Sequence, residues 1–418
     1  MGQTMAEKIL AKAAGVKSAA PGDLLDVYPH VAMSHENAGL VSKVFKTIGV
    51  SRVWDPEKII IIFDHRVPAE SDKTAAGQKA VRDFVKAQNI KNFYDINVGI
   101  CHQVLPENGH VRPGEVLVGT DSHTTTQGAF GNFATGIGAT EMAAVWATGK
   151  LWMMVPESIK IVTHGKFRDG VYAKDLILYI IGMLRADGAD YKSVEFYGEA
   201  ISEMSVSSRM VLCNLSMEMG AKSALVPPDG KTLDFVMSAT SIPFEVIKAD
   251  PDASYLQTID IDLSDLRPQL ACAHSVDNVK KVSEVEGTPI HQAFLGSCTN
   301  GRLEDLEIGA KLLAGKRIHP DVRLLIIPAS WKVYREAIKK GHIETFIDAG
   351  AVILNPGCGP CLGAHQGLLA PGERCISSTN RNFKGRMGST ESEVYLGSPA
   401  TVIASAIAGK IVSPEGKV

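Results

Sequence analysis

The stretch Glu115-Val-Leu-Val-Gly-Thr-Asp-Ser-His123 runs directly from an apolar, β-branched segment into a polar loop. Strands of parallel sheets are rich in Val, Ile and Leu because helices cover both of their faces. The expected strand Glu115–Gly119 therefore favours an α/β protein with parallel sheets. Ligands of such proteins bind beyond the carboxyl ends of the strands, so the polar residues that follow this strand predict a ligand site.

The same pattern, an apolar strand followed at once by chemically active side chains, occurs at three other places in the chain. These are Ile59–Phe63 before Asp64 and His65, Ala293–Gly296 before Cys298, and Ala351–Leu354 before the loop with Cys358 and Cys361. Four separate segments thus deliver His, Asp, Ser and Cys to equivalent positions in the predicted sheets. We expect these side chains to share one crevice.

The rest of the chain alternates in the same way between short β-branched runs and helical patterns. Further strands are expected at Ile159–Thr163 and Leu324–Ile327, and helices at Lys73–Gln88, Ala139–Thr148, Lys174–Leu184 and Leu303–Leu313. Two stretches resemble domain joints, namely Met154–Pro156 and the polar stretch from Asp277 to Thr288. We therefore predict three α/β domains, at residues 1–155, 156–286 and 287–418.

Composition excludes several classes of partner. The 418 residues are 45% hydrophobic and 21% charged, with a net charge of −3, so no basic excess favours nucleic acid or an anionic membrane surface. The longest apolar run, Leu176 to Leu184, is far shorter than the roughly 20 residues that span a bilayer. The N-terminus lacks an apolar signal core, and we expect a cytoplasmic protein.

Seven cysteines, an odd number in a long chain, favour metal binding or burial over disulfides. Cys358 and Cys361 form a CxxC pair, which alone also fits half of a zinc site or a redox pair. With Cys298 they make three thiolates and no obvious fourth, which suits a [4Fe–4S] cluster with one open iron. Zinc and inert thiols remain alternatives. The other four are expected to be buried and unreactive: Cys101, Cys213, Cys272 and Cys375.

Three histidines, His65, His102 and His123, lie in these polar loops, with Asp64 and Asp121 close in sequence. A single histidine is more often a structural residue than a functional one. Three of them at strand ends, near carboxylates, favour a proton-transfer site, because a carboxylate partner fixes the tautomer and the pKa of an imidazole.

A last polar cluster, Ser378-Thr-Asn-Arg-Asn-Phe-Lys-Gly-Arg386, places two arginines in one loop. Arginine binds carboxylates through two parallel hydrogen bonds, so Arg381 and Arg386 are candidates for substrate carboxylates. The alternative is a surface turn with solvated arginines.

Together the motifs closely resemble the aconitase superfamily. Gly119-Thr-Asp-Ser-His123, Gly296-Ser-Cys-Thr-Asn300, Cys358-Gly-Pro-Cys361 and Asn380-Arg-Asn-Phe-Lys-Gly-Arg386 occur in the order of that family. The resemblance runs from Phe63-Asp-His65 to the C-terminus. Within the superfamily the chain is most similar to large subunits of the 3-isopropylmalate dehydratase and homoaconitase type.

The resemblance implies a role for individual residues. Cys298, Cys358 and Cys361 would be the cluster ligands. Asp64 with His65, Asp121 with His102, and Glu218 with His123 would be three carboxylate–imidazole pairs. Ser122, Asn214, Arg381 and Arg386 would hold the substrate. The chain departs from the family at Ser34-His35, where aconitase has a substrate-binding glutamine, and this disfavours citrate as the substrate.

The resemblance further implies a three-domain core around a [4Fe–4S] cluster with one labile iron. It implies reversible removal of water from a small di- or tricarboxylate, with His65 as the acid. The catalytic serine would come from a small subunit that carries the family's mobile fourth domain, which we expect this chain to lack. We expect 3-isopropylmalate as the substrate, as in leucine biosynthesis, with homocitrate or homoaconitate, citramalate and dimethylmalate as alternatives. Two other classes are an RNA-binding relative and a zinc-stabilised scaffold without catalysis.

Overall fold

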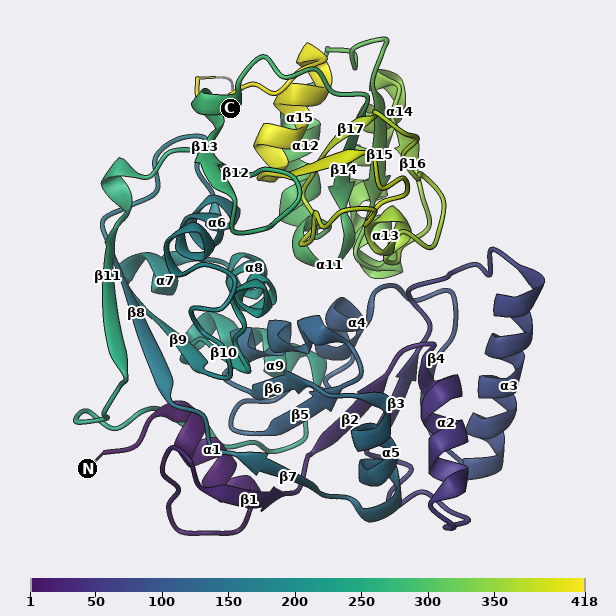
Figure 1. Cartoon of the computed structure of the whole chain (residues 1–418), viewed down its shortest axis with the longest axis vertical. Coiled ribbons are helices and arrows are strands. Elements are labelled where there is room, and N and C mark those ends of the chain that lie inside the picture. Colours follow the sequence, from purple (N-terminus) through teal and green to yellow (C-terminus); the bar gives the residue numbers. More distant parts are fainter. Residues whose placement is uncertain (1, 417–418) are drawn as a thin grey trace.

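Consecutive residues of the strand β3 (Ile59–Ile62) face two different hydrophobic cores. Ile59 and Ile61 pack in one core, and Ile60 and Ile62 pack in another. Because side chains alternate along a strand, a run of four isoleucines has to be covered on both sides of its sheet. The computed structural model, which describes residues 2–416, provides this cover with helices on both faces (Figure 1).

The N-terminal part of the chain forms a five-stranded sheet, purple to blue in Figure 1. Its strands are all parallel, in the order β4-β3-β2-β5-β6. The other strands are β2 (Val31–Ser34), β4 (Asn92–Tyr94), β5 (Val116–Gly119) and β6 (Phe133–Gly136). The helices are α1 (Met5–Ala13), α2 (Ala38–Thr47), α3 (Asp72–Gln88), α4 (Cys101–Glu107), the 3-10 helix η1 (Ser122–Phe130) and α5 (Ala139–Thr148).

The middle of the chain forms a four-stranded sheet in the order β10-β9-β8-β11, again all parallel. Its strands are β8 (Ser158–His164), β9 (Ser193–Gly198), β10 (Ser223–Leu225) and β11 (Gln257–Asp262). Its helices are α6 (Ala173–Leu184), α7 (Glu199–Glu203), α8 (Val206–Leu215), the 3-10 helix η2 (Ser216–Met219) and α9 (Gly230–Ala239). A separate antiparallel ribbon pairs β1 (Leu24–Val27) with β7 (Leu151–Met154).

The C-terminal part, green to yellow in Figure 1, forms a seven-stranded sheet in the order β13-β12-β18-β17-β14-β15-β16. Only β12 runs antiparallel to its neighbours. The strands are β12 (Gln269–Ala271), β13 (Val279–Lys281), β14 (Gln292–Gly296), β15 (Arg323–Ile327), β16 (Val352–Ile353), β17 (Arg374–Ser377) and β18 (Glu393–Leu396). The helices are the 3-10 helix η3 (Leu263–Asp265), α10 (Val282–Val285), α11 (Ser297–Asn300), α12 (Leu303–Leu313), α13 (Trp331–Lys339), α14 (His342–Ala349), the 3-10 helix η4 (Gly359–Leu362) and α15 (Pro399–Ala408).

The predicted α/β class with largely parallel sheets is confirmed. Each predicted strand overlaps an observed one, and the helices expected at 139–148 and 303–313 have the observed bounds of α5 and α12. The three domain ranges stay a prediction. In the structure, β12 and β13 precede residue 287 yet pair within the seven-stranded sheet, so the change of sheet falls between Asp262 and Gln269.

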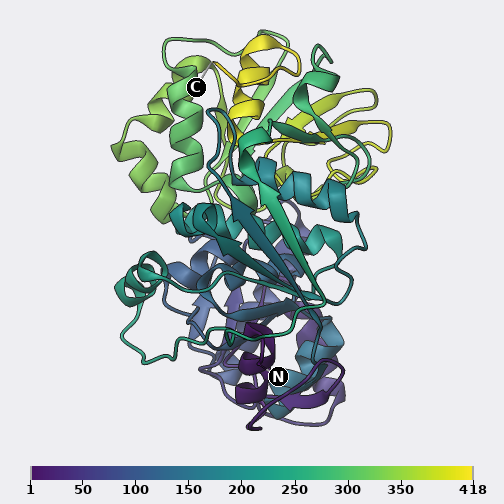
Figure 2. The ribbon, with the colours of Figure 1, turned by 90° about the vertical axis from the view of Figure 1, so that its left-hand side faces the viewer.

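One hydrophobic core joins all three sheets, because Ile60, Ile161 and Leu325, from one sheet each, belong to it. Figure 2 shows the four-stranded sheet between the N-terminal and C-terminal parts. This packing brings loops that follow strands of separate sheets to a common cavity. Within residues 2–416, no helix has the length and apolar character needed to cross a membrane.

Candidate active site

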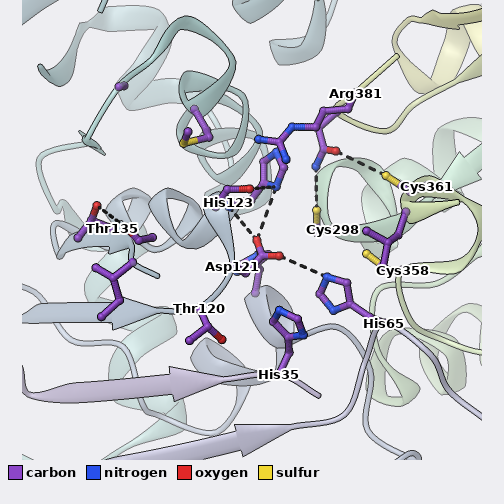
Figure 3. Close-up of a pocket in the computed structure, with 18 of the residues that line it drawn as sticks. His35, His65, Thr120, Asp121, His123, Thr135, Cys298, Cys358, Cys361 and Arg381 are labelled. Atoms are coloured by element: carbon purple, nitrogen blue, oxygen red, sulfur yellow. Dashed lines mark hydrogen bonds and ion pairs between the residues drawn. The ribbon is translucent and has the colours of Figure 1, made fainter. Parts of the chain in front are cut away.

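A cavity of about 560 Å³ is lined by side chains from all three parts of the chain. Nearly all of the residues predicted to form a site contribute to its wall. These are Asp64, His65, His102, Asp121, Ser122, His123, Cys298, Cys358, Cys361, Arg381 and Arg386. Figure 3 shows His65, Asp121 and His123 pointing toward one another, with Cys298, Cys358 and Cys361 close by. Asn214 and Glu218 lie behind this wall and contact it.

The first carboxylate–imidazole pair follows β3 directly. His65 Nδ1 lies 2.6 Å from Asp64 Oδ1, and the other Asp64 oxygen accepts the backbone N–H of Cys101 at 2.7 Å. Asp64 is fully buried, so its orientation is fixed. Burial alone would lower the pKa of His65, but Asp64, the Cys358 thiol and Asp121 outweigh burial and hold this pKa well above its usual value. His65 is therefore arranged to carry a proton.

Asp121, after β5, connects the three histidines. It lies 2.8 Å from His102 Nε2 and 3.3 Å from His65 Nε2, and it accepts the backbone N–H of His123 at 2.7 Å. Burial would raise the pKa of Asp121, but the contacts with His102, His123 and His65 hold it well below its usual range. Asp121 is thus an anion that orients imidazoles, rather than a proton donor.

The third pair lies between two parts of the chain. His123 Nε2 is 2.7 Å from Glu218 Oε1, and Arg381 donates its Nε–H to the same oxygen at 2.8 Å. Glu218 comes from η2, directly after α8, and Arg381 from the loop after β17. The three predicted pairs therefore form, while their catalytic roles stay a prediction.

Cys298 lies in α11, which begins with a tight turn directly after β14. Gly296 has φ 146°, and a Cβ there would lie 2.2 Å from the carbonyl oxygen of Ile327, so only glycine fits. The turn leaves the Cys298 side chain 4% exposed at the cavity wall, beside Cys358 and Ile100. The backbone N–H of Cys358 donates to the carbonyl of Asp64 at 2.8 Å, which joins the cysteine loop to the first imidazole pair.

Two amide side chains contact the thiols. Asn214 and Asn380 direct Nδ2 at the sulfur of Cys298, at 3.4 and 3.2 Å, and the Oδ1 of Asn380 lies 3.5 Å from the sulfur of Cys361. N–H donors of this kind stabilise thiolates that ligate metal. Burial raises the pKa of Cys298 to about 12, and the neighbouring Cys358 and Cys361 add to this shift. Ionising Cys298 is therefore favoured by a cationic partner.

The spacing of the thiols bears on which metal group would fit. A tetrahedral zinc ion with Zn–S bonds of about 2.3 Å needs sulfurs about 3.8 Å apart. Over residues 2–416, the one group of metal-ligating donor atoms that lie within 4.8 Å of one another contains no cysteine. The three sulfurs are thus spread more widely than a single ion allows, and a larger cluster suits them better.

The compact group of donors consists of His35, Glu36, Asp64 and His65. Hydrogen bonds already account for it, because Glu36 accepts the backbone N–H groups of Asp64, His65 and Arg66 at 2.9 to 3.1 Å. His35 stacks on His65, with ring centroids 4.1 Å apart and 24° between the planes. We interpret this group as support for His65 rather than as a metal site.

Two arginines and a serine complete the cavity wall. Arg386 Nε is buried with no hydrogen-bond partner among the described residues, and Arg381 is engaged with Glu218. The Arg386 guanidinium therefore has donors available to an anion in the cavity. Ser122, at the start of η1, lies near His123 with its Oγ 3.4 Å from His123 Nδ1. The surface-turn alternative does not apply to Arg386, which lines the cavity.

Sequence reasoning did not assign a role to His35, Glu36 or Asn380. Glu36 and His35 follow β2, so the strand-end pattern could have identified them, although β2 is too short to stand out in the sequence. Asn380 lies in the arginine loop, but its contact with two cysteines depends on the sheet order. The remaining cysteines, Cys101, Cys213, Cys272 and Cys375, are buried and absent from the cavity wall, as predicted.

Comparisons with known proteins agree with this geometry. The model of the Aconitase family (aconitate hydratase) matches residues 7–409. The chain is 56% identical to the probable 3-isopropylmalate dehydratase large subunit of Methanothermobacter thermautotrophicus, over 99% of both chains. It is 54% identical to the 3-isopropylmalate dehydratase large subunit 1 of Methanopyrus kandleri, again over 99% of both.

A further relative carries another name. The probable methanogen homoaconitase large subunit of M. thermautotrophicus is 53% identical over 98% of this chain and 97% of its own. Among solved structures, aconitase X from Thermococcus kodakaraensis aligns over 85% of this chain and 84% of its own, with a TM-score of 0.48 and 13% identity, a likeness too distant to bear on function. The matches at high identity, and the family model that spans residues 7–409, show that the chain belongs to the aconitase family of hydro-lyases.

Proposed function

We propose that this chain is the large subunit of a [4Fe–4S] hydro-lyase that removes and re-adds water on a substituted malate, with 3-isopropylmalate as the substrate. The observation that carries this proposal is the common cavity of about 560 Å³, in which three thiols face three carboxylate–imidazole pairs and two arginines.

Cys298, Cys358 and Cys361 would hold the cluster. When bound, the cluster supplies a Lewis-acidic iron that polarises the C–O bond of the substrate. The fit rests on the three buried thiols, the amide donors of Asn214 and Asn380 at Cys298, and a sulfur spacing too wide for one ion.

His65 would protonate the departing hydroxyl. Asp64 binds Nδ1 of the ring, so Nε2 faces Asp121 and the cavity. An acid with a raised pKa stays protonated near neutral pH and can give its proton to the leaving group. On re-addition of water, the same imidazole would take the proton back.

Arg386, Arg381 and Ser122 would bind the carboxylates of the substrate. The unpartnered Nε of Arg386 and its planar guanidinium suit bidentate binding of a carboxylate. Binding the carboxylates fixes the carbon from which a proton is removed, so the substrate is oriented before reaction.

The base for that proton would come from a small subunit that carries the family's mobile domain and a catalytic serine. Support comes from the relatives, which are named large subunits and match this chain over nearly its whole length. The small subunit would also close the cavity and exclude water.

A second candidate is homoaconitase activity, favoured by the 53% identity to a homoaconitase large subunit. The two candidates share the malate core and differ in the group that extends from it. The iron, the acid and the arginines would all contact the malate core that the two substrates share. The pocket for the extending group would therefore decide between the substrates, and part of that pocket would lie on the small subunit.

The test is anaerobic co-purification with a matching small subunit, followed by assays on isopropylmalate and homocitrate. We expect a brown protein with iron and acid-labile sulfide that turns over isopropylmalate only when the small subunit is present. A colourless protein with stoichiometric zinc would overturn the proposal. Full turnover by this chain alone would overturn the two-subunit part.

A further inference from the structure

Lys174, in the first turn of α6, is a fully buried cation that the proposed reaction does not use. Its Nζ donates hydrogen bonds to the backbone carbonyls of Ser378, at 2.8 Å, and Thr379. Within residues 2–416, no carboxylate lies within ion-pair distance of this ammonium. Burying an ammonium whose hydrogen bonds go only to carbonyls is unfavourable, so negative charge nearby is expected.

The two carbonyls belong to the segment that carries the thiol contacts. Asn380 follows Thr379, and its amide lies 3.2 Å from the sulfur of Cys298 and 3.5 Å from that of Cys361. Ser378 also accepts the N–H of Gly296, in the turn before Cys298, through its side chain at 3.0 Å. Lys174 therefore holds in place the backbone after β17, which contacts both Gly296 and the sulfur of Cys298.

Arg209 and Arg302 are also almost completely buried, and each has an acid near it. Arg209 binds Asp229 through both terminal nitrogens. Arg302 donates to the carbonyls of Cys298 and Thr299, both at 2.7 Å, and its own backbone N–H binds Asp305 at 2.9 Å. No acid binds the Lys174 ammonium directly, and Asp305 and Asp175 act on it only through longer-range electrostatics.

The electrostatics agree with the geometry. Burial lowers the pKa of Lys174 to about 7, and the negative charges of Cys298 and Cys361, followed by those of Asp305 and Asp175, act in the opposite direction. Thiolates therefore stabilise the charged form of this lysine, and by the same interaction the lysine stabilises the thiolates. The low dielectric constant of the protein interior strengthens this attraction between the ammonium and the thiolates.

We propose that Lys174 is a positioning residue of the metal centre, whose ammonium fixes the 378–379 backbone and balances the negative charge of the thiolate-bound cluster. The inference rests on the cluster proposed above. Reduction adds negative charge to such a centre, so a nearby buried cation favours the reduced form. Loss of the cation makes the cluster easier to oxidise, and oxidation releases the labile iron.

The experiment compares Lys174→Gln with Lys174→Arg in the anaerobically purified protein. Glutamine keeps an N–H donor for the carbonyls but removes the charge, whereas arginine keeps both. We expect Lys174→Gln to hold iron and sulfide, to have a more negative midpoint potential, and to lose iron in air severalfold faster. Lys174→Arg should restore both properties toward the wild type. Arg209→Gln, which removes a buried cation that is bound to Asp229 and contacts none of the thiols, should change neither.

Thermal unfolding of the cluster-free proteins shows whether a Lys174 variant has lost stability. A loss of stability can then be distinguished from an effect on the cluster. If Lys174→Gln does not fold, the same measurements on Lys174→Met decide, because an unbranched apolar chain suits the buried position. An unchanged potential and an unchanged rate of iron loss in the neutral variant would overturn this inference alone. Absence of iron from the wild-type protein would overturn the proposed function as well.

Discussion

The two walls of the cavity differ in how many of their polar side chains have a charged or hydrogen-bonding partner within the chain. The histidine wall consists of His65, His102, Asp121 and His123, from loops and short helices that follow strands of the five-stranded sheet. Each of its imidazoles has a carboxylate within 2.8 Å. The thiol wall consists of Cys298, Cys358, Cys361 and Arg386, from loops and short helices that follow strands of the seven-stranded sheet. Here the Cys298 sulfur is contacted by two amides and the Thr299 hydroxyl but by no cation, and a guanidinium nitrogen of Arg386 has no partner among the described residues.

The difference indicates that contacts within the chain hold the side chains of the histidine wall in place. The side chains of the thiol wall have fewer such partners and are available to a bound ligand. Asp121 illustrates the first case, since it holds three imidazoles at once. Buried thiols illustrate the second, because burial disfavours their ionisation until a cation is near. Mutations in the two walls should therefore have separable effects on metal content and on turnover.

The largest effect is expected from the thiol wall. Cys298→Ser should remove iron, sulfide and all measurable activity, because a three-thiolate centre cannot spare a ligand. Iron analysis and the visible spectrum of the anaerobic protein check this. Cys375→Ser is the matched control, since Cys375 is equally buried in β17 of the same sheet and lies away from the cavity wall. Equal iron loss in both variants would contradict the assignment.

The next effect concerns the histidine wall. With the small subunit present, His65→Ala should lower kcat by roughly two to four orders of magnitude, as for loss of a general acid. The cluster spectrum should not change, because the thiols keep their amide contacts. His110→Ala, which removes a histidine bonded to Tyr94 outside the cavity, should leave kcat near that of the wild type. Near-normal turnover of the His65 variant with full iron would remove His65 from the mechanism.

The comparison of the walls also explains what sequence could reveal. Strands such as β3 and β5 were recognisable because both of their faces are buried, so their sequences are continuous apolar runs. Reactive side chains that follow such runs, Asp64 and Cys298 among them, were found for the same reason. The pairing of His123 with Glu218 could be named only by resemblance, since 95 residues separate the two.

Other contacts were beyond sequence reasoning because they depend on how the sheets are ordered. Asn380 reaches Cys298 only because β17 lies beside β14 in the sheet, although the strands are far apart in the chain. Lys174 was predicted as part of an apolar helix, and its partners come from a loop more than 200 residues away. The change of sheet before β12 was missed because β12 is three residues long and antiparallel.

A third prediction compares the two arginines. Arg386→Lys should lower kcat/KM by roughly tenfold to a hundredfold, since a lysine keeps the charge but loses the charge-assisted bidentate contact, worth about 1.5–3 kcal/mol. Arg381→Lys should have a smaller effect on KM, because Glu218 already occupies one side of its guanidinium. Steady-state kinetics with metal-replete enzyme measure both. An equal rise of KM in the two variants would indicate that the Glu218 contact breaks when substrate binds.

The smallest effect is expected at His35, where the chain departs from aconitase. His35 stacks on His65 at 4.1 Å, and stacked aromatic pairs contribute about 0.5–1.5 kcal/mol. If the stack serves only to orient the acid, His35→Ala should lower kcat about three- to tenfold and leave the iron content unchanged. His35→Phe keeps a ring in the same place and should recover most of that loss. Recovery by Phe would make His35 a support for the histidine wall. A Phe variant as slow as the Ala variant would instead assign the effect to the ring nitrogens, of which Nδ1 accepts the backbone N–H of Asn37 at 3.4 Å.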